Sequence, residues 1–385
     1  MRVNPNIENA PGYPFVRLAQ ARRDAQARGI EVLDLSMGQP TDPAPAFVRD
    51  ALREAVATLP LCDYPSAEGL PELRAAIAAW IERRFGATLD PDRELLPTLG
   101  AKEPIATIAR LFAREGDAIA VTSPSYPVPE RSARAAGLSL SLQQLTRERE
   151  WLPDPERIDW RRASVVWVVT PHNPTGAVAP LELLGELAER CRASGAVLAV
   201  DETYSEFWFD GAAPASALEL ADRRGVVVFN SLSKRSGLAG LRCGFLAGDP
   251  EIARRVRRHR SDIGTTPQTF VQRAAIAAWR DESHVRAARE RYAHKRELLA
   301  AAASAAGFAD AGAPAGIFLW LGVPGGDDVR AYELLLERGL LVVPGSYLGP
   351  GGEGYLRVAL TAPGEQTARA VELLRTGARA HAGAG

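Results

Sequence analysis

Cysteine, lysine and long apolar runs are all scarce in this sequence. Its 385 residues include only three cysteines, Cys62, Cys191 and Cys243, and their scattered positions lack the paired spacing of a disulfide framework. The polar, Asn-rich segment 1–10 lacks the apolar stretch of a signal peptide, and no apolar run reaches the length of a membrane-spanning helix. We therefore expect a soluble protein of the reducing cytoplasm.

An excess of charge of one sign is also absent. The 46 Lys and Arg residues balance the 47 Asp and Glu residues, which leaves a formal net charge of -1. No overall field then attracts nucleic acid or an anionic membrane, so we expect neither as a partner. The five histidines show no spacing typical of metal ligands, and we expect no metal site.

The scarcity of lysine narrows the search for reactive amines. Only Lys102, Lys234 and Lys295 carry an amine that can lose its proton and form a Schiff base. Lys295 lies among basic residues of an expected helix, which favours a surface position. Lys102 stands at the start of an expected helix. Lys234 directly follows an apolar strand, where a sheet can hold an amine in place.

Helical and strand-like segments alternate along most of the chain, and 46% of the residues are hydrophobic, enough for an ample core. Such alternation predicts an α/β fold with a mostly parallel sheet covered by helices. The expected strands are 118–121, 165–170, 196–201, 226–230 and 244–247, and the expected helices between and around them include 71–85 and 181–193.

A change in composition after residue 267 indicates a second domain. The Ala- and Arg-rich segment 283–306 predicts a helix that bridges two domains, and the apolar runs after it predict a smaller α+β unit. We expect a large domain at 46–285, a small domain at 286–385, and an N-terminal arm at 1–45 that packs with the small domain.

Three expected strands deliver polar groups to one edge of the sheet. Lys234 follows strand 226–230, Asp201 and Tyr204 follow strand 196–200, and Asn173 follows strand 165–170. Ligands of open α/β sheets bind at this edge. An amine, an acid, a phenol and an amide suit pyridoxal phosphate, because its aldehyde needs a lysine, its pyridine nitrogen a carboxylate and its ring oxygen neutral donors.

The order of these groups resembles that of the class I and II aminotransferases of fold type I. Three family motifs match: Asn-Pro-x-Gly at 173–176, Asp-x-x-Tyr at 201–204, and Ser-x-Ser-Lys at 231–234 with Arg242 eight residues later. The resemblance extends over residues 38–357. It implies a mostly parallel seven-stranded sheet sandwiched by helices, with a smaller α+β domain.

The resemblance also implies roles for the residues that surround the cofactor ring. Lys234 would form the Schiff base and move a proton between the substrate α-carbon and the cofactor. Asp201 would pair with the ring nitrogen, and Tyr204 and Asn173 would hydrogen-bond the ring oxygen. Tyr126 would stack on the ring.

The cofactor phosphate would be bound by a loop and the N-terminus of the following helix. Gly100, Ala101 and Lys102 would form this loop, and side chains from the segment after strand 226–230 would complete the site. These side chains are Ser231, Ser233 and Arg242.

Other family positions concern the substrate and a second subunit. Arg357 would clamp the substrate α-carboxylate through two parallel hydrogen bonds, and Gly38 would supply backbone to the same group. Asn173 would contact the substrate as well as the cofactor. Tyr64 matches a tyrosine that reaches the phosphate of the neighbouring subunit, which implies a homodimer with shared active sites. A carboxylate at the far end of the substrate would need another cation, and the sequence leaves Arg17 and Arg235 open as candidates.

Fold type I also includes C–S lyases, so the reaction needs a separate argument. A clamped α-carboxylate favours removal of the α-proton and hence transamination. Segments 201–209, 231–245, 277–285, 344–348 and 357–363 resemble succinyldiaminopimelate aminotransferases, which implies N-succinyl-2-amino-6-oxopimelate as acceptor and glutamate as donor in lysine biosynthesis. Aminotransfer to or from aspartate, acetylornithine or another amino acid remains an alternative, as does a β-eliminating C–S lyase.

Two further patterns have simpler interpretations. Residues 349–354 read G-x-G-x-x-G, but they precede a strand instead of opening a helix, so they predict a turn and not a dinucleotide site. The five arginines of segment 254–260 lie on an amphipathic helix and predict a solvated helix face.

Overall fold

The seven-stranded sheet predicted above is present. The structure is a computed structural model that describes residues 6, 12–59 and 63–381, so Cys62 lies outside the described residues. The strand order is β2-β8-β7-β6-β5-β3-β4. The five strands from β7 to β4 run parallel, β8 runs antiparallel to β7, and β2 runs antiparallel to β8. The strands are β2 (Leu95–Thr98), β3 (Ala118–Ser123), β4 (Ser139–Gln144), β5 (Ala163–Val169), β6 (Val197–Asp201), β7 (Val226–Ser231) and β8 (Gly244–Gly248).

Both faces of this sheet are covered by helices, which explains the near-continuous apolar sequence of its strands. In β5, Val166 and Val168 face one core while Val165, Trp167 and Val169 face the other. The first core is closed by α4 (Pro71–Phe85), α7 (Leu181–Ser194) and α10 (Thr269–Arg280), and the second by α5 (Lys102–Phe112), α6 (Val128–Ala135) and α9 (Pro250–Ile263). Helix α3 (Ala46–Ala57) packs on α10.

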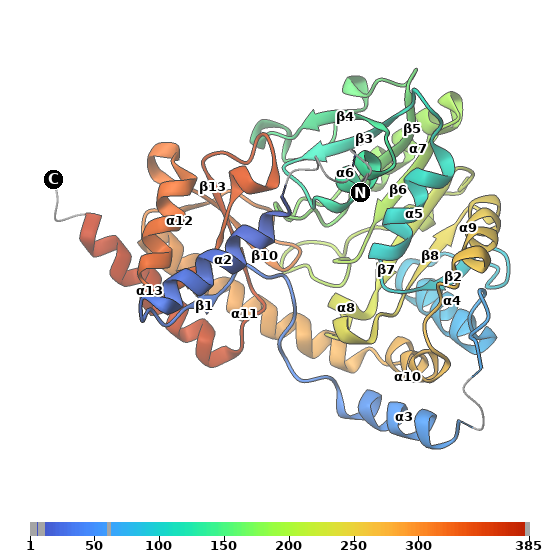
Figure 1. Cartoon of the computed structure of the whole chain (residues 1–385), viewed down its shortest axis with the longest axis horizontal. Helices are drawn as coiled ribbons and strands as arrows, with labels where there is room; N and C mark the ends of the chain where they lie inside the picture. The colour runs from blue at the N-terminus through green and yellow to red at the C-terminus, as the bar shows by residue number, and fades with distance from the viewer. Residues whose placement is uncertain (1–5, 7–11, 60–62, 382–385) are drawn as a thin grey trace, which may run out of the picture.

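A smaller sheet forms the other part of the molecule (Figure 1). Its antiparallel order is β12-β13-β10-β9, and one apolar cluster joins it to the helices around it. The elements are α2 (Pro14–Ala27), α11 (Ser283–Ala305), β9 (Ala309–Asp310), β10 (Phe318–Gly322), α12 (Asp328–Glu337), β12 (Val343–Pro344), β13 (Tyr355–Ala359) and α13 (Gly364–His381).

The N-terminal segment lies against this smaller part. Strand β1 (Leu33–Asp34) pairs in parallel with β11 (Leu340–Leu341), and α2 contacts α12. The division of the chain at residues 45 and 285 stays a proposal. Residues 349–354 form turns before β13, as their sequence predicts.

The predicted surface position of Lys295 is wrong, and the predicted solvated face of segment 254–260 is confirmed for Arg254, Arg255 and Arg258 but wrong for Arg260. Lys295 is buried in α11, with its Nζ 3.8 Å from a carboxylate oxygen of Asp42, because the loop that carries Asp42 lies over this helix. Arg260 of α9 is fully buried, with its Nε 3.3 Å from a carboxylate oxygen of Glu103 and donating to the Thr265 carbonyl at 2.8 Å. Helix α9 packs on α5, the helix of Glu103, so its last turn is not part of a solvated face.

In the described part of the chain, no helix combines the length and the apolar character needed to cross a membrane. No group of three or more His, Cys, Asp or Glu side chains suited to a metal ion occurs among the same residues.

Candidate active site

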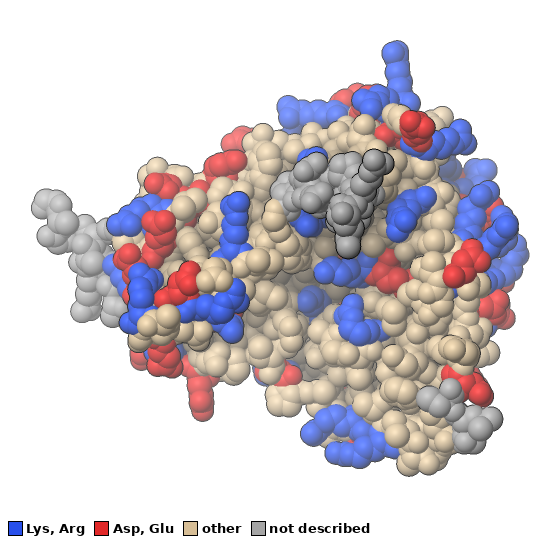
Figure 2. All heavy atoms as spheres, viewed as in Figure 1, with Lys and Arg blue, Asp and Glu red and all other residues tan. Residues whose placement is uncertain are grey.

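Three parallel strands end around one cavity of about 430 Å³. Strand β6 ends with Asp201, β7 ends with Ser231, and β5 ends just before the segment of Asn173. The first turn after β7 is α8 (Leu232–Arg235), which carries Lys234. Figure 2 shows the molecule hollowed near the middle of this face, with Lys and Arg side chains around the hollow. The cavity is lined by Ala101, Lys102, Ile105, Tyr126, Val169, Asp201, Thr203, Tyr204, Ser231, Ser233, Lys234, Ala239 and Arg242.

Lys234 is half-buried and lines this cavity. Its Nζ donates a hydrogen bond to the Gly38 carbonyl. Burial lowers the pKa of Lys234 to about 8; the nearby Arg357 and Arg242 also lower it, while Asp201 acts in the opposite direction. At this pKa the neutral amine is a minority near physiological pH, but its share is far larger than for an ordinary lysine, and neutral amines attack aldehydes.

Asp201 is the acid of the cavity and is 5% exposed. One of its carboxylate oxygens accepts hydrogen bonds from the backbone N–H of Thr203 at 3.0 Å and from its hydroxyl at 2.5 Å. Burial raises the pKa of Asp201, and the bonds from Thr203 and the charge of Lys234 counteract this effect. A buried carboxylate with one oxygen oriented in this way is suited to a cationic partner. The sequence analysis missed Thr203, although it lies inside the Asp-x-x-Tyr motif.

Asn173, Tyr204 and Arg357 form one buried network. Asn173 Nδ2 donates to Tyr204 Oη at 3.2 Å, and Arg357 Nη1 donates to Asn173 Oδ1 at 3.0 Å. Arg357 Nη2 donates to the Ser36 carbonyl at 2.6 Å, whereas its buried Nε has no partner among the described residues. The Arg357 guanidinium also lies 4.3 Å from the ring centroid of Phe318.

Arg357 is a buried cation without a buried anion. Arg357 is 2% exposed, and none of the ion pairs among the described residues includes it; the only nearby groups that act on its charge favourably are the phenols of Tyr204, Tyr13 and Tyr126. Burial lowers its pKa to about 10. Because an isolated buried charge is costly, this guanidinium is suited to an anionic ligand.

The expected phosphate loop lies at the N-terminus of α5, where backbone N–H groups are free of helical partners. Arg242 crosses to this loop and donates to the Leu99 carbonyl at 3.0 Å. A Cβ on Gly100 would lie 2.8 Å from Arg242 Nη2, so glycine permits this close approach. The Ser231 and Ser233 hydroxyls are 2.8 Å apart on the facing segment. Hydroxyls, a guanidinium and a helix N-terminus together fit a phosphate dianion.

An aromatic pair from distant parts of the sequence borders the cavity. Tyr126 is mostly buried, and burial raises its pKa. Its side chain is hydrogen-bonded to Tyr13, a residue that the sequence analysis missed. Tyr13 immediately precedes α2, and the cations Lys102 and Arg131 lie 5.7 and 5.5 Å from its ring centroid. The only sequence signal for Tyr13 was its place between Gly12 and Pro14.

Not every predicted residue lies in the cavity. Tyr64 is fully exposed in the single chain, so any role at a cofactor requires a second subunit. The Gly38 carbonyl contacts Lys234, and its role toward the substrate stays a prediction. Of the two candidates for a distal cation, Arg235 is fully buried and bonded to Glu282, and Arg17 lies at the surface, 5.7 Å from the Tyr347 ring.

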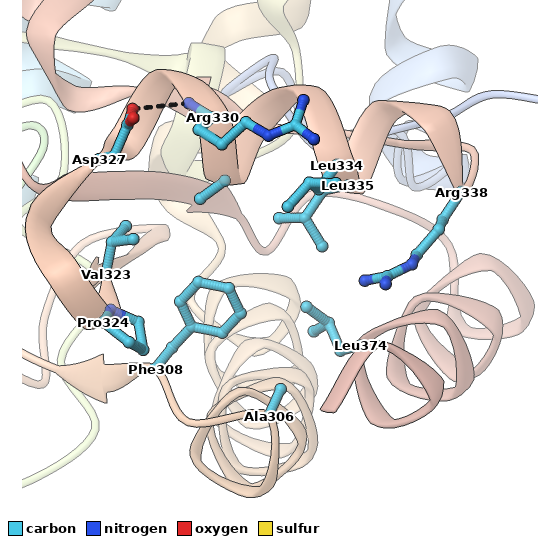
Figure 3. Close-up of a pocket in the computed structure, with 11 residues that line it drawn as sticks. Ala306, Phe308, Val323, Pro324, Asp327, Arg330, Leu334, Leu335, Arg338 and Leu374 are labelled. Carbon is cyan, nitrogen blue, oxygen red and sulfur yellow. Dashed lines mark hydrogen bonds between the residues drawn. The ribbon is translucent and has the colours of Figure 1, made fainter. Parts of the chain in front are cut away.

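A more apolar cavity of about 190 Å³ lies in the smaller part of the molecule (Figure 3). Phe308, Leu335 and Leu374 point into it, and Arg338 lies at its edge. Its lining is mainly apolar, and it holds no lysine that could form a Schiff base. The chemistry described above is therefore concentrated in the cavity around Lys234.

The chain is also similar to known proteins over most of its length. Residues 30–374 match the family model described as "Aminotransferase class I and II". The "LL-diaminopimelate aminotransferase" of Dehalococcoides mccartyi is 35% identical over 97% of this chain and 98% of its own length. A "4-dedimethylamino-4-oxo-anhydrotetracycline transaminase" of Streptomyces rimosus is 37% identical over 96% of this chain and 100% of its own length. The solved structure of a "probable N-succinyldiaminopimelate aminotransferase" from Thermus thermophilus has a TM-score of 0.87 and 31% identity, covering 94% of this chain and 100% of that one.

Proposed function

Because this chain belongs to the class I and II aminotransferases, we propose that it transfers an amino group from glutamate to an acidic oxo acceptor of diaminopimelate and lysine biosynthesis. The chain is an aminotransferase, and pyridoxal phosphate is its cofactor, since the family depends on it. The donor, the acceptor and the roles of individual residues are the proposed part.

The observation that carries this proposal is that the guanidinium of Arg357 is buried and forms no ion pair with a carboxylate of the described residues. Its Nη1 and Nη2 already donate to Asn173 and Ser36, and its unpartnered Nε is available to an incoming carboxylate. A substrate bound through its α-carboxylate keeps that group during the reaction. The α-proton is then the group that leaves, which distinguishes transamination from decarboxylation.

The remaining residues have distinct tasks. When bound, pyridoxal phosphate supplies an aldehyde that captures amines and a ring that accepts an electron pair. Lys234 would hold the cofactor through its Nζ and would take the α-proton of the substrate on that same atom. Asp201 would keep a proton on the ring nitrogen. The Asn173–Tyr204 pair would donate to the ring oxygen, and Tyr126 would fix the ring orientation.

The mouth of the cavity supports a substrate with a second acidic group. Lys102 and Arg131 lie 5.7 and 5.5 Å from the centroid of the Tyr13 ring, and Tyr13 is hydrogen-bonded to Tyr126 of the cavity lining. With Lys102 assigned to the phosphate, Arg131 is the cation we propose for the distal carboxylate. This assignment replaces Arg17 and Arg235.

For the acceptor itself we propose N-succinyl-2-amino-6-oxopimelate. Five segments of the sequence resemble succinyldiaminopimelate aminotransferases, and the names of two similar proteins refer to diaminopimelate or its succinyl form. The competing substrates are LL-diaminopimelate, aspartate and acetylornithine.

A spectrum of the holoenzyme tests the donor, and product analysis tests the acceptor. L-Glutamate should convert the cofactor to its amine form, seen as loss of its visible absorbance, with release of 2-oxoglutarate. Pyruvate and thiol released from cystathionine without an oxo acid would instead favour the C–S lyase. If glutamate does not change the spectrum, the proposed donor is wrong.

We also propose a homodimer in which Tyr64 reaches the phosphate of the partner subunit, supported by the complete exposure of Tyr64 in the single chain. Two inactive variants test this. In a mixed dimer of Lys234→Ala and Tyr64→Ala chains, one of the two sites has both native residues, so mixing should restore activity. Equal inactivity before and after mixing would contradict a shared site.

A further inference from the structure

Two segments that resemble succinyldiaminopimelate aminotransferases meet beside Lys234. Segment 231–245 includes α8, and segment 277–285 runs from the end of α10 into α11. The cofactor cavity is lined by residues of the first segment and by none of the second. The contacts between the second segment and α8 therefore need another explanation.

A chain of hydrogen bonds joins these segments. His284 Nδ1 lies 2.5 Å from Asp281 Oδ1, and His284 Nε2 lies 2.8 Å from the Ser236 hydroxyl, two residues after Lys234. Burial lowers the pKa of His284, which favours the neutral imidazole. A neutral imidazole that donates from Nδ1 accepts at Nε2, so Ser236 donates to His284 and His284 donates to Asp281.

A second contact anchors the residue directly after Lys234. The fully buried Arg235 donates to the Ala278 carbonyl at 2.8 Å and to Glu282 Oε1 at 2.5 Å. Its guanidinium lies 5.0 Å from the ring centroid of Trp279. Both residues that follow the lysine are thus bound to the segment that opens α11.

These anchors matter because α8 is very short. It has four residues, and a single helical turn is not stable on its own. The direction of the Lys234 side chain therefore depends on what holds the ends of α8. We propose that Asp281, His284 and Ser236 form a positioning relay that aims Lys234 at the reacting atoms. This proposal rests on the function proposed above.

A serine bonded to a histidine that is bonded to an aspartate is also the catalytic arrangement of serine hydrolases, in which the serine is the nucleophile. A cavity of about 270 Å³ borders Ser236 and His284. However, the backbone N–H groups of Ser236 and Gly237 donate to the Leu232 and Lys234 carbonyls. They are not available as oxyanion donors, which favours positioning over hydrolysis.

Variants of the holoenzyme test the relay. Ser236→Ala and His284→Leu should lower kcat with glutamate about tenfold, because a catalytic group displaced by a fraction of an ångström loses much of its rate, while KM stays within about twofold. Ser236→Thr retains the hydroxyl and should restore most of kcat. His294→Leu, an exposed histidine of the same helix, should have no effect.

The absorbance of the bound cofactor provides a readout independent of turnover. Lys234 faces Asp201, Arg357 and Arg242, so a displaced Nζ feels a different field. The pH midpoint of the absorbance change should shift by about half a unit or more in Ser236→Ala and His284→Leu, and not in Ser236→Thr. Thermal unfolding identifies a variant that fails to fold.

The outcomes separate this inference from the proposed function. A wild-type midpoint and kcat in folded Ser236→Ala and His284→Leu would overturn the relay. So would a Ser236→Thr variant as impaired as Ser236→Ala, because the hydroxyl would then not be the important group. Failure of the wild type with glutamate would refute the proposed donor, while the shift in midpoint would still test the relay.

Discussion

Replacement of Arg357 by glutamine tests how the substrate is recognised. The side chain is 2% exposed and makes no ion pair with any described residue, so the charge of an incoming carboxylate would be its first full neutralisation. Loss of one partner of a buried, hydrogen-bonded charge pair costs about 2–5 kcal/mol. This range corresponds to a decrease in kcat/KM of about 30-fold to several thousand-fold.

The burial and the free Nε of Arg357 place the expected loss in the upper half of this range. Arg357→Lys keeps a charge but loses the planar pair of donors, so its kcat/KM should lie between those of the wild type and Arg357→Gln. Arg369→Gln, an exposed arginine of α13 that pairs with Glu31, is the matched control and should react like the wild type.

The assay is the half-reaction with L-glutamate, followed by the loss of cofactor absorbance. A parallel reaction with a primary amine that lacks an α-carboxylate provides the reference. If Arg357 binds the α-carboxylate, Arg357→Gln should react slowly with glutamate and at the wild-type rate with the amine. Equal losses with both compounds, or no loss with glutamate, would refute the reasoning.

Three further predictions follow from the site. The pKa of Lys234 is lowered to about 8, so capture of pyridoxal phosphate by the apoenzyme should accelerate as pH rises through 8 and level off above about pH 9. A rate still rising at about pH 10 would indicate an ordinary lysine. Arg131→Gln should raise KM for the dicarboxylic acceptor about tenfold and leave KM for alanine unchanged, and equal effects on both would contradict a distal site. A Cβ on Gly244 would lie 2.5 Å from the Asn230 carbonyl oxygen, so Gly244→Ala should lower the free energy of unfolding by about 1–3 kcal/mol and weaken cofactor binding. Gly240→Ala, where a Cβ meets nothing within 4 Å, is its control in thermal and cofactor titrations.

The chemistry of the site could be predicted from the sequence because it depends on strand ends. Lys234 and Asp201 each follow a buried apolar strand, and parallel strands bring their carboxyl ends to one edge. This rule explains why one cavity is lined by Lys234, Asp201, Tyr204 and Arg242. The edge strands β2 and β4 were missed because β2 contains a proline and β4 is a half-exposed, polar segment.

Contacts between distant segments could not be predicted in this way. Tyr13, just before α2, is hydrogen-bonded to Tyr126 of the cavity lining, and His284 reaches Ser236 across 48 positions of sequence. Lys295 and Arg260 are charged residues that usually lie at the surface, and only the packing of a loop on α11 and of α9 on α5 buries them.

The sequence by itself determined which groups reach the sheet edge and hence the cofactor chemistry, since strand periodicity and local motifs act over short distances. Only the tertiary structure decided which arginines already have a carboxylate partner and which can bind the carboxylate of a substrate. Arg235 is bonded within the fold and Arg357 is left without an acid, because that difference depends on side chains brought together from remote parts of the chain.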